Sequence, residues 1–216
     1  MSLKASLTEL LFPVRCIACS ALGLKLCSQC RLSWIAHIYT TTHRGVRPFT
    51  IYSAVRYSSI AKKILISSKE QGIERADSLI IEALDHSLRY ALARDWADFL
   101  IPIPSRKSIT RQRGRSYISD LTKELSQESS IPVADVLIHT RKIRDQSGLH
   151  SVDRFRNLEG ALEAQMAPRG RALIVDDLVT TGATLLEARR ALEAEGIEVV
   201  GAITACIAQS VSHFSR

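Results

Sequence analysis

The sequence predicts an α/β protein in which helices flank a mostly parallel sheet, with a small cysteine-rich segment in front of it. After residue 50, short apolar runs typical of strands alternate with stretches of helical periodicity, which is the order in which parallel sheets are built. Before residue 45, four cysteines fall within fifteen residues. We therefore expect two parts, a cysteine-rich segment over residues 1–45 and an α/β domain over residues 46–216.

Each element of the α/β domain has its own signal in the sequence. Alternating apolar and polar residues predict a strand at 51–57, and Ser58 or Ser59 is a candidate N-cap for the helix that follows and ends at Gly72. Apolar residues at helical spacing predict a long helix over about 73–93. Further strands are expected at 99–104, 133–139, 172–176 and 199–207, and further helices around 117–125 and before Gly196. A linker is expected at 45–50 and a loop at 106–115.

Composition and charge exclude some classes of protein. The chain has 216 residues, of which 46% are apolar and 24% charged, so it is not disordered throughout. No apolar run reaches the roughly 18 residues that crossing a bilayer requires, and residues 1–12 do not resemble a signal peptide, which predicts a cytoplasmic protein. The net charge of +7 suits an anionic ligand, either a phosphorylated small molecule or nucleic acid, but it also fits an ordinary protein of high pI.

The cysteines form two C-x-x-C pairs, Cys16 with Cys19 and Cys27 with Cys30, separated by seven residues. This spacing suits one tetrahedral Zn²⁺ held by four thiolates. Disulfides are the alternative, and they are not expected in a reducing cytosol. A closed shell of four thiolates leaves no open coordination position, so we interpret the segment as a zinc knuckle, similar to a double zinc ribbon, whose metal is structural. The fifth cysteine, Cys206, lies in an apolar run and is expected to be buried.

The most specific feature is the run 173–185, which reads LIVDDLVTTGATL. Asp176 and Asp177 follow a buried-type strand, at the end where α/β sheets bind ligands. Hydroxyls, a glycine and the N–H groups of a starting helix then make a phosphate cradle over residues 180–184. Carboxylates beside a phosphate site need sugar hydroxyls or a Mg²⁺ ion to bind. The run therefore predicts a site for a phosphorylated sugar, with hydroxyls on the two aspartates.

This run resembles the loop with which type I phosphoribosyltransferases bind phosphoribosyl pyrophosphate (PRPP), and it matches that loop without departure. The resemblance implies a type I phosphoribosyltransferase fold and a Mg²⁺ ion that binds with PRPP. It also implies that Asp176 and Asp177 hold the ribose hydroxyls and are the catalytic candidates. The PRPP-binding residues that it implies are Asp176, Asp177, Leu178, Val179, Thr180, Thr181, Gly182, Ala183 and Thr184.

The order of motifs along the whole chain is similar to that of the ComF family of competence-associated phosphoribosyltransferase-like proteins. A four-cysteine knuckle comes first, then Ile-Pro-Ile-Pro at 101–104, a basic stretch, and Thr-Arg at 140–141. One departure is at 113–117, where the family usually has Arg-Gly-Phe-Asn-Gln and this chain has Arg-Gly-Arg-Ser-Tyr. A second is at 157–162, where Asn-Leu-Glu-Gly-Ala-Leu stands for Asn-Val-x-Gly-Ala-Phe.

Basic residues gather in two stretches that are candidates for binding the pyrophosphate of PRPP or the phosphates of DNA. The first, 106–115, has five basic residues and no acid, and its alternative interpretation is a solvated loop. The second, 140–157, matches the place where type I enzymes carry a mobile loop over the site. The candidate phosphate ligands are Arg106, Lys107, Arg111, Arg113, Arg115, Arg141 and Arg154.

Three functions remain open from the sequence. The first is Mg²⁺-dependent transfer of the phosphoribosyl group to an unidentified acceptor, with release of pyrophosphate. The second, which the resemblance to competence proteins implies, is binding of single-stranded DNA during DNA uptake, together with other competence proteins. The third is a PRPP-sensing regulator without catalysis. No acceptor pocket can be recognised in the sequence.

Overall fold

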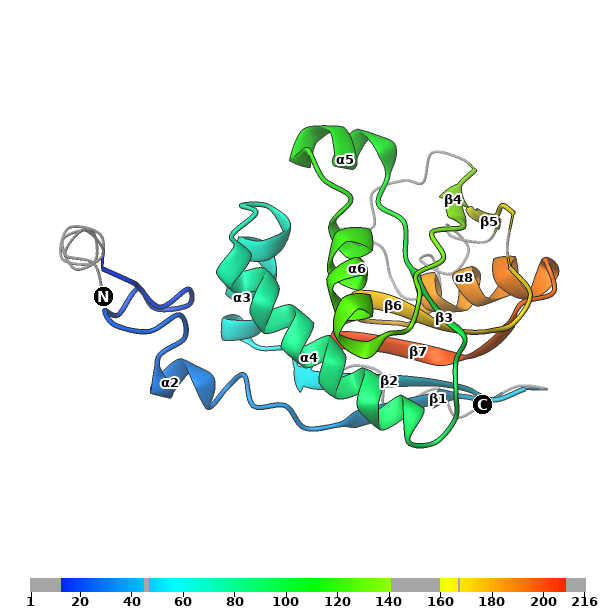
Figure 1. Cartoon of the computed structure of the whole chain (residues 1–216). Helices are drawn as coiled ribbons and strands as arrows, with labels where there is room; N and C mark the ends of the chain where they lie inside the picture. The colour runs from blue at the N-terminus through cyan, green and yellow to red at the C-terminus, as the bar shows by residue number, and fades with distance from the viewer. Residues whose placement is uncertain (1–12, 45–46, 141–159, 167, 209–216) are drawn as a thin grey trace.

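The computed structural model describes residues 13–44, 47–140, 160–166 and 168–208. A five-stranded sheet has the order β1-β2-β7-β6-β3 and is parallel except for β1, which pairs antiparallel with β2. Its strands are β1 (Tyr39–His43), β2 (Phe49–Arg56), β3 (Phe99–Pro102), β6 (Arg171–Val179) and β7 (Glu198–Ile207). Figure 1 shows helices on both sides of this sheet, which confirms the predicted layers.

Helices cover the two faces of the sheet unequally. On one face lie α3 (Ser59–Lys69), α4 (Glu74–Leu92) and α6 (Tyr117–Ser129), and on the other lies α8 (Ala183–Ala194) (Figure 1). Smaller elements are α2 (Ser28–Arg31), α5 (Lys107–Arg113) and the antiparallel pair β4 (Leu137–His139) and β5 (Leu162–Ala164). Among the described residues, no helix has the length and apolar character that crossing a membrane requires.

Strand β6 is buried on both faces, which explains its continuous apolar sequence. Leu173 and Val175 belong to the apolar cluster under α3, α4 and α6, whereas Ala172 and Ile174 belong to the cluster under α8. Successive side chains of a strand point to opposite faces. The strand therefore anchors both layers at once, and its carboxyl end has a fixed position relative to the helices on either side.

Helix α3 is positioned by its cap and by its apolar face. The Ser58 side chain accepts a hydrogen bond from the backbone N–H of Ala61, at 3.1 Å, as an N-cap does. Residues at helical spacing on one side of α3, including Ile64 and Leu65, are buried against the sheet and α4. The last residue of the helix is Lys69, which lies at the carboxyl edge of the sheet.

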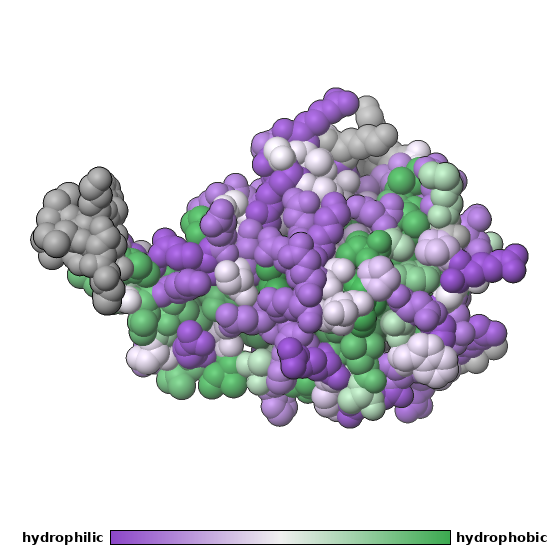
Figure 2. Space-filling model, viewed as in Figure 1, coloured by the Kyte–Doolittle hydropathy of each residue, from purple (hydrophilic) through white to green (hydrophobic). Residues whose placement is uncertain are grey.

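The N-terminal segment packs against α3. The ammonium group of Lys63 donates a hydrogen bond to the carbonyl oxygen of Ala18 at 2.6 Å. Leu26 and Trp34 are buried in the same apolar cluster as Ile64 of α3. Apolar side chains also gather on the outer end of this segment, where Figure 2 shows a hydrophobic surface. The N-terminal segment and helix α3 therefore share one apolar core.

Most predicted elements are confirmed, two are corrected, and some observed elements were not expected. The stretch 106–115 is not a loop, because α5 forms there and ends at Gly114 in the left-handed conformation, φ 71°. The strand expected over 133–139 is confined to β4, while Val133 makes an isolated bridge to Leu100. Strand β1 was not expected; its polar Thr-Thr-Thr run suits an edge strand, where apolar periodicity is weak.

Candidate functional site

The two aspartates lie in a cleft of about 520 Å³ at the carboxyl end of β6. The sequence suggested that both acids follow the strand. In the structure β6 continues to Val179, so both acids lie within it. The backbone N–H of Asp177 donates to Oδ1 of Asp176 at 2.9 Å, which fixes the first carboxylate against the chain. Asp177 itself is only 5% exposed.

Two carboxylates this close are electrostatically costly. Burial, followed by the negative charge of Asp177, raises the pKa of Asp176 well above its usual value, although Lys69 acts in the opposite direction. Lys69 lies beside the pair, with Nζ 2.9 Å from Oδ2 of Asp177. This lysine was not identified from the sequence, because it is 108 residues away from its partner and belongs to no motif.

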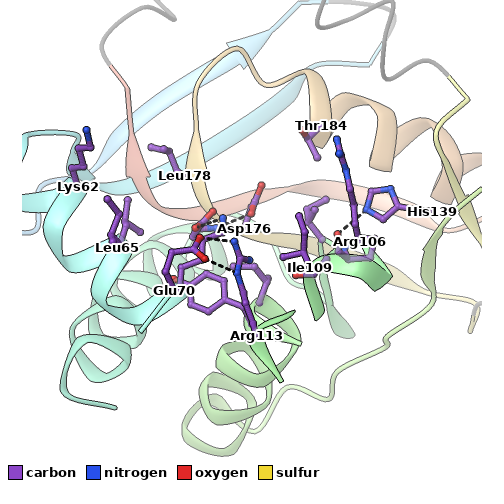
Figure 3. A pocket seen from close by; sticks show the side chains of 18 of the residues that line it. Lys62, Leu65, Glu70, Arg106, Ile109, Arg113, His139, Asp176, Leu178 and Thr184 are labelled. Atoms are coloured by element: carbon purple, nitrogen blue, oxygen red, sulfur yellow. Dashed lines mark hydrogen bonds and ion pairs between the residues drawn. The ribbon is translucent and has the colours of Figure 1, made fainter. Parts of the chain in front are cut away.

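The cleft has two chemically different ends, with Asp176 between them (Figure 3). Toward one end lie Arg106, Thr184 and His139, whose Nε2 is 3.0 Å from the carbonyl oxygen of Pro104. Toward the other end lie Lys62, Leu65 and Leu178 (Figure 3). The remaining lining residues are Tyr57, Ile66, Lys69, Glu70, Ile103, Pro104, Ser105, Ile109, Arg113, Tyr117, Ile118 and Asp177.

The predicted phosphate cradle turns at Gly182 into the N-terminus of α8. Gly182 has φ 77°, a left-handed conformation that side chains rarely adopt. A Cβ atom there would lie 2.8 Å from Nε2 of His43, so the imidazole of β1 packs directly on the loop. Nε2 of His43 is buried and has no hydrogen-bond partner among the described residues. No motif in the sequence pairs His43 with residue 182, so this contact could not be recognised from the sequence.

The basic candidates have different surroundings. Arg113 pairs with Glu70, the residue directly after α3, with Nε 3.0 Å from Oε2, and Arg115 pairs with Asp77 of α4 at 2.7 Å. Arg106 lines the cleft, and Arg111 is exposed on the last turn of α5. Lys107 is the first residue of α5. Arg141 and Arg154 lie outside the described residues. Binding of phosphate by any of these residues stays a prediction.

The four cysteines of the N-terminal segment come together in space. Their sulfur atoms all lie within 4.8 Å of one another, and Sγ of Cys19 is 3.5 Å from Sγ of Cys27. Tetrahedral zinc with Zn–S bonds of about 2.3 Å places its sulfurs roughly 3.8 Å apart, so the cluster can hold this ion. Cys16 and Cys30 are buried, whereas Cys19 is exposed. Cys206 is fully buried in the core, as predicted.

Comparison with known proteins agrees with this geometry. Residues 112–212 match the family model of the phosphoribosyl transferase domain. Competence protein F of Haemophilus influenzae is 30% identical over 106 residues, a stretch that covers 47% of this chain and only 46% of that protein.

Solved structures show weaker similarity over a longer stretch. Orotate phosphoribosyltransferase from Aeropyrum pernix is 19% identical with a TM-score of 0.41, covering 77% of this chain and 73% of that chain. Adenine phosphoribosyl transferase from Trypanosoma brucei is 12% identical with a TM-score of 0.44, covering 82% and 90%.

The domain match and the mostly parallel sheet define a type I phosphoribosyltransferase-like fold, as the sequence predicted. Two further findings agree with the predicted resemblance: the cysteine cluster near the N-terminus, and the similarity to Competence protein F. Residues 112–212 thus match a phosphoribosyl transferase domain, and about half of the chain is similar to Competence protein F.

The charge of Asp176 is expected to cost stability. Because its pKa is raised in the folded state, the penalty is absent below the ordinary pKa of an aspartate, grows from there up to the raised pKa, and is complete above it. Asp176→Asn should therefore raise the melting temperature at neutral pH, by roughly 2–4 °C for a gain of about 1 kcal/mol. The gain should shrink toward acid pH in thermal unfolding monitored by circular dichroism. Asp177→Asn is the control and should not stabilise, because it removes the partner of Lys69.

Gly182→Ala should destabilise the protein by about 1–3 kcal/mol, because it adds backbone strain and a contact with His43. The double variant His43→Ala/Gly182→Ala has the backbone strain but not the contact. It should therefore lose less stability than the two single variants lose in sum. Urea unfolding of both single variants and the double variant measures this coupling. Purely additive losses would show that the imidazole does not press on the loop.

Proposed function

We propose that this protein binds PRPP in the cleft and transfers its phosphoribosyl group to a nitrogen acceptor, with release of pyrophosphate. The observation that supports this most directly is the pair Asp176 and Asp177 in the middle of a cleft, with the N-terminus of α8 on one side. Carboxylates accept hydrogen bonds from sugar hydroxyls, and the N–H groups at a helix N-terminus bind phosphate. One ligand that carries both groups at this spacing is a ribose phosphate.

Each part of the site has a role in this proposal. The 5′-phosphate lies on residues 180–184, and the ribose hydroxyls lie on the two aspartates. The bond from C1 of the ribose to a pyrophosphate oxygen breaks, the bond from C1 to the acceptor nitrogen forms, and the acceptor loses its proton. Positive charge develops on the sugar in between, and the nearby carboxylates stabilise it. Arg106 faces the leaving pyrophosphate, whose charge a Mg²⁺ ion carried by PRPP also offsets.

The acceptor is proposed to bind at the opposite end of the cleft. That end has Tyr57, the aliphatic side chains of Leu65 and Leu178, and Ile66, which is 41% exposed although it is a large apolar residue. Ligand pockets are typically lined by such side chains, with a few polar groups that orient the ligand. An aromatic and aliphatic surface favours a flat heterocycle over a hydrophilic acceptor.

Calorimetric titration with PRPP and Mg²⁺ tests the proposed site. Wild type should show saturable binding, and Asp176→Asn/Asp177→Asn should weaken it at least about tenfold, because two charged hydrogen-bond acceptors are lost. Asp85→Asn is the matched control, since Asp85 pairs with Arg89 on the outer side of α4. Equal affinity in wild type and the double variant would contradict the proposed position of the ribose.

A role in competence, and in DNA uptake, is proposed from the similarity to Competence protein F alone. Binding of single-stranded DNA by the stretch 106–115 stays a prediction, and it is not strengthened by the ion pairs of Arg113 and Arg115. Catalysis and PRPP sensing are separated by measuring pyrophosphate release with a range of bases and with single-stranded DNA. A cytoplasmic location and other protein partners also stay predictions.

For the cysteine cluster we propose structural zinc. Elemental analysis of the purified protein should find about one zinc per chain, as expected for a four-thiolate site. Cys16→Ser should lower the zinc content and the melting temperature, because the segment shares its core with α3. Cys206→Ser is the control for zinc content, since this cysteine is buried elsewhere. Full zinc occupancy in Cys16→Ser would rule out this ligand set.

A further inference from the structure

Lys69 is a cation built into the site by the fold. It is the last residue of α3, and its Nζ lies 2.9 Å from Oδ2 of Asp177. The side chain of Asp177 is 7% exposed and that of Lys69 is 35% exposed, so the pair is shielded from solvent more than a surface ion pair is. The ammonium group also lies 5.4 Å from the centre of the ring of Tyr117.

The lysine is charged and has little freedom to leave. Burial by itself lowers the pKa of Lys69, but the charges of Asp177 and Asp176 outweigh it and raise the pKa above its usual value. The residues on either side of it are also bonded. Ser68 donates to Asp77, and its hydroxyl oxygen lies 3.2 Å from the hydroxyl of Tyr117.

Glu70, the residue that follows Lys69 in the chain, is also held in place. It accepts two hydrogen bonds from Arg113 of α5, of which Figure 3 shows the side chains. The last two residues of α3 and Glu70 directly after it therefore contact α4, α5, α6 and β6. This arrangement fixes the end of α3, and with it the backbone that carries the ammonium group to the acid pair.

An ammonium group in this place affects how the acid pair can bind a metal ion. Mg²⁺ requires nearly octahedral oxygen coordination and usually takes one or two carboxylates together with several waters. Here one carboxylate oxygen of the pair already accepts from Lys69, and a divalent ion beside it would be repelled by the ammonium charge. Asp176 and Asp177 are therefore poorly suited to hold Mg²⁺ directly, although PRPP can still carry the ion on its pyrophosphate.

We propose that Lys69 takes the place of a divalent cation at the acid pair, so that the ribose end of the ligand binds with little dependence on Mg²⁺. This inference rests on the proposed function. The lysine neutralises one of the two carboxylates. The other carboxylate oxygens of the pair then accept hydrogen bonds from the ribose hydroxyls. Lys69 is a positioning residue in this scheme, because it acts on the ribose through Asp177.

The test uses ribose 5-phosphate as the probe, because it has the sugar and the 5′-phosphate but no pyrophosphate to carry Mg²⁺. Its affinity for the full-length, zinc-loaded protein is measured by calorimetry with added Mg²⁺ and in a buffer depleted of Mg²⁺ beforehand, without a chelator that would remove the zinc. Wild type should change by less than about threefold between the two buffers. Lys69→Met should lose about tenfold in the Mg²⁺-free buffer, the size of one charged hydrogen bond, and should regain most of it in Mg²⁺. Lys69→Arg should behave as wild type does.

Lys123→Met is the matched control, since it removes a lysine charge from an exposed position on α6 that does not line the cleft. Melting temperatures of all variants show whether each one is folded. A tenfold loss for wild type in the Mg²⁺-free buffer would overturn the inference, because the acid pair would then need Mg²⁺. Equal affinity of wild type and folded Lys69→Met in the Mg²⁺-free buffer would overturn it as well.

Failure of the proposed function gives a different result. Folded wild type would then bind neither ribose 5-phosphate nor PRPP in either buffer, and the inference about Lys69 would fall with it. If PRPP binds and only the Mg²⁺ dependence at the ribose differs from that expected, the proposed function stands and Lys69 is a structural residue.

Discussion

The site depends on how two adjacent negative charges are held at the end of a strand that is buried on both faces. Strand β6 supplies apolar side chains to both cores, so its carboxyl end cannot move to relieve the repulsion between Asp176 and Asp177. Removing one partner of a buried ion pair is strongly destabilising. The ammonium group of Lys69 offsets part of this negative charge. Because Lys69 is the last residue of α3, the ion pair depends on the position of that helix.

This requirement connects the N-terminal segment to the site. Helix α3 contacts the segment through Lys63 and through apolar side chains that include Ile64, and it contacts the acid pair through Lys69. A closed cysteine cluster has no open position for chemistry, but it can fix the segment against which α3 packs. A zinc ion held there would contribute to the site through the position of a helix, since none of the four cysteines lines the cleft.

The sequence predicts well those features whose residues are neighbours in the chain. The run 173–185 and the two C-x-x-C pairs contain their whole chemistry within a few residues, so periodicity and spacing are sufficient to recognise them. The layers of the fold follow for the same reason. What the sequence could not predict depends on long-range contacts: Lys69 finds its partner 108 residues away, and His43 meets Gly182 only when β1 joins the sheet.

The basic stretch at 106–115 shows why charge alone is a poor guide to ligands. Counted in the sequence, its arginines form an uncompensated cluster, but in the fold Arg113 pairs with the acid just after α3 and Arg115 pairs with an acid of α4. These pairs fasten α5 and the start of α6 to the two helices that precede them in the chain. Part of the positive charge that suggested a polyanion is therefore used inside the molecule, to hold the wall of the cleft that faces the acid pair.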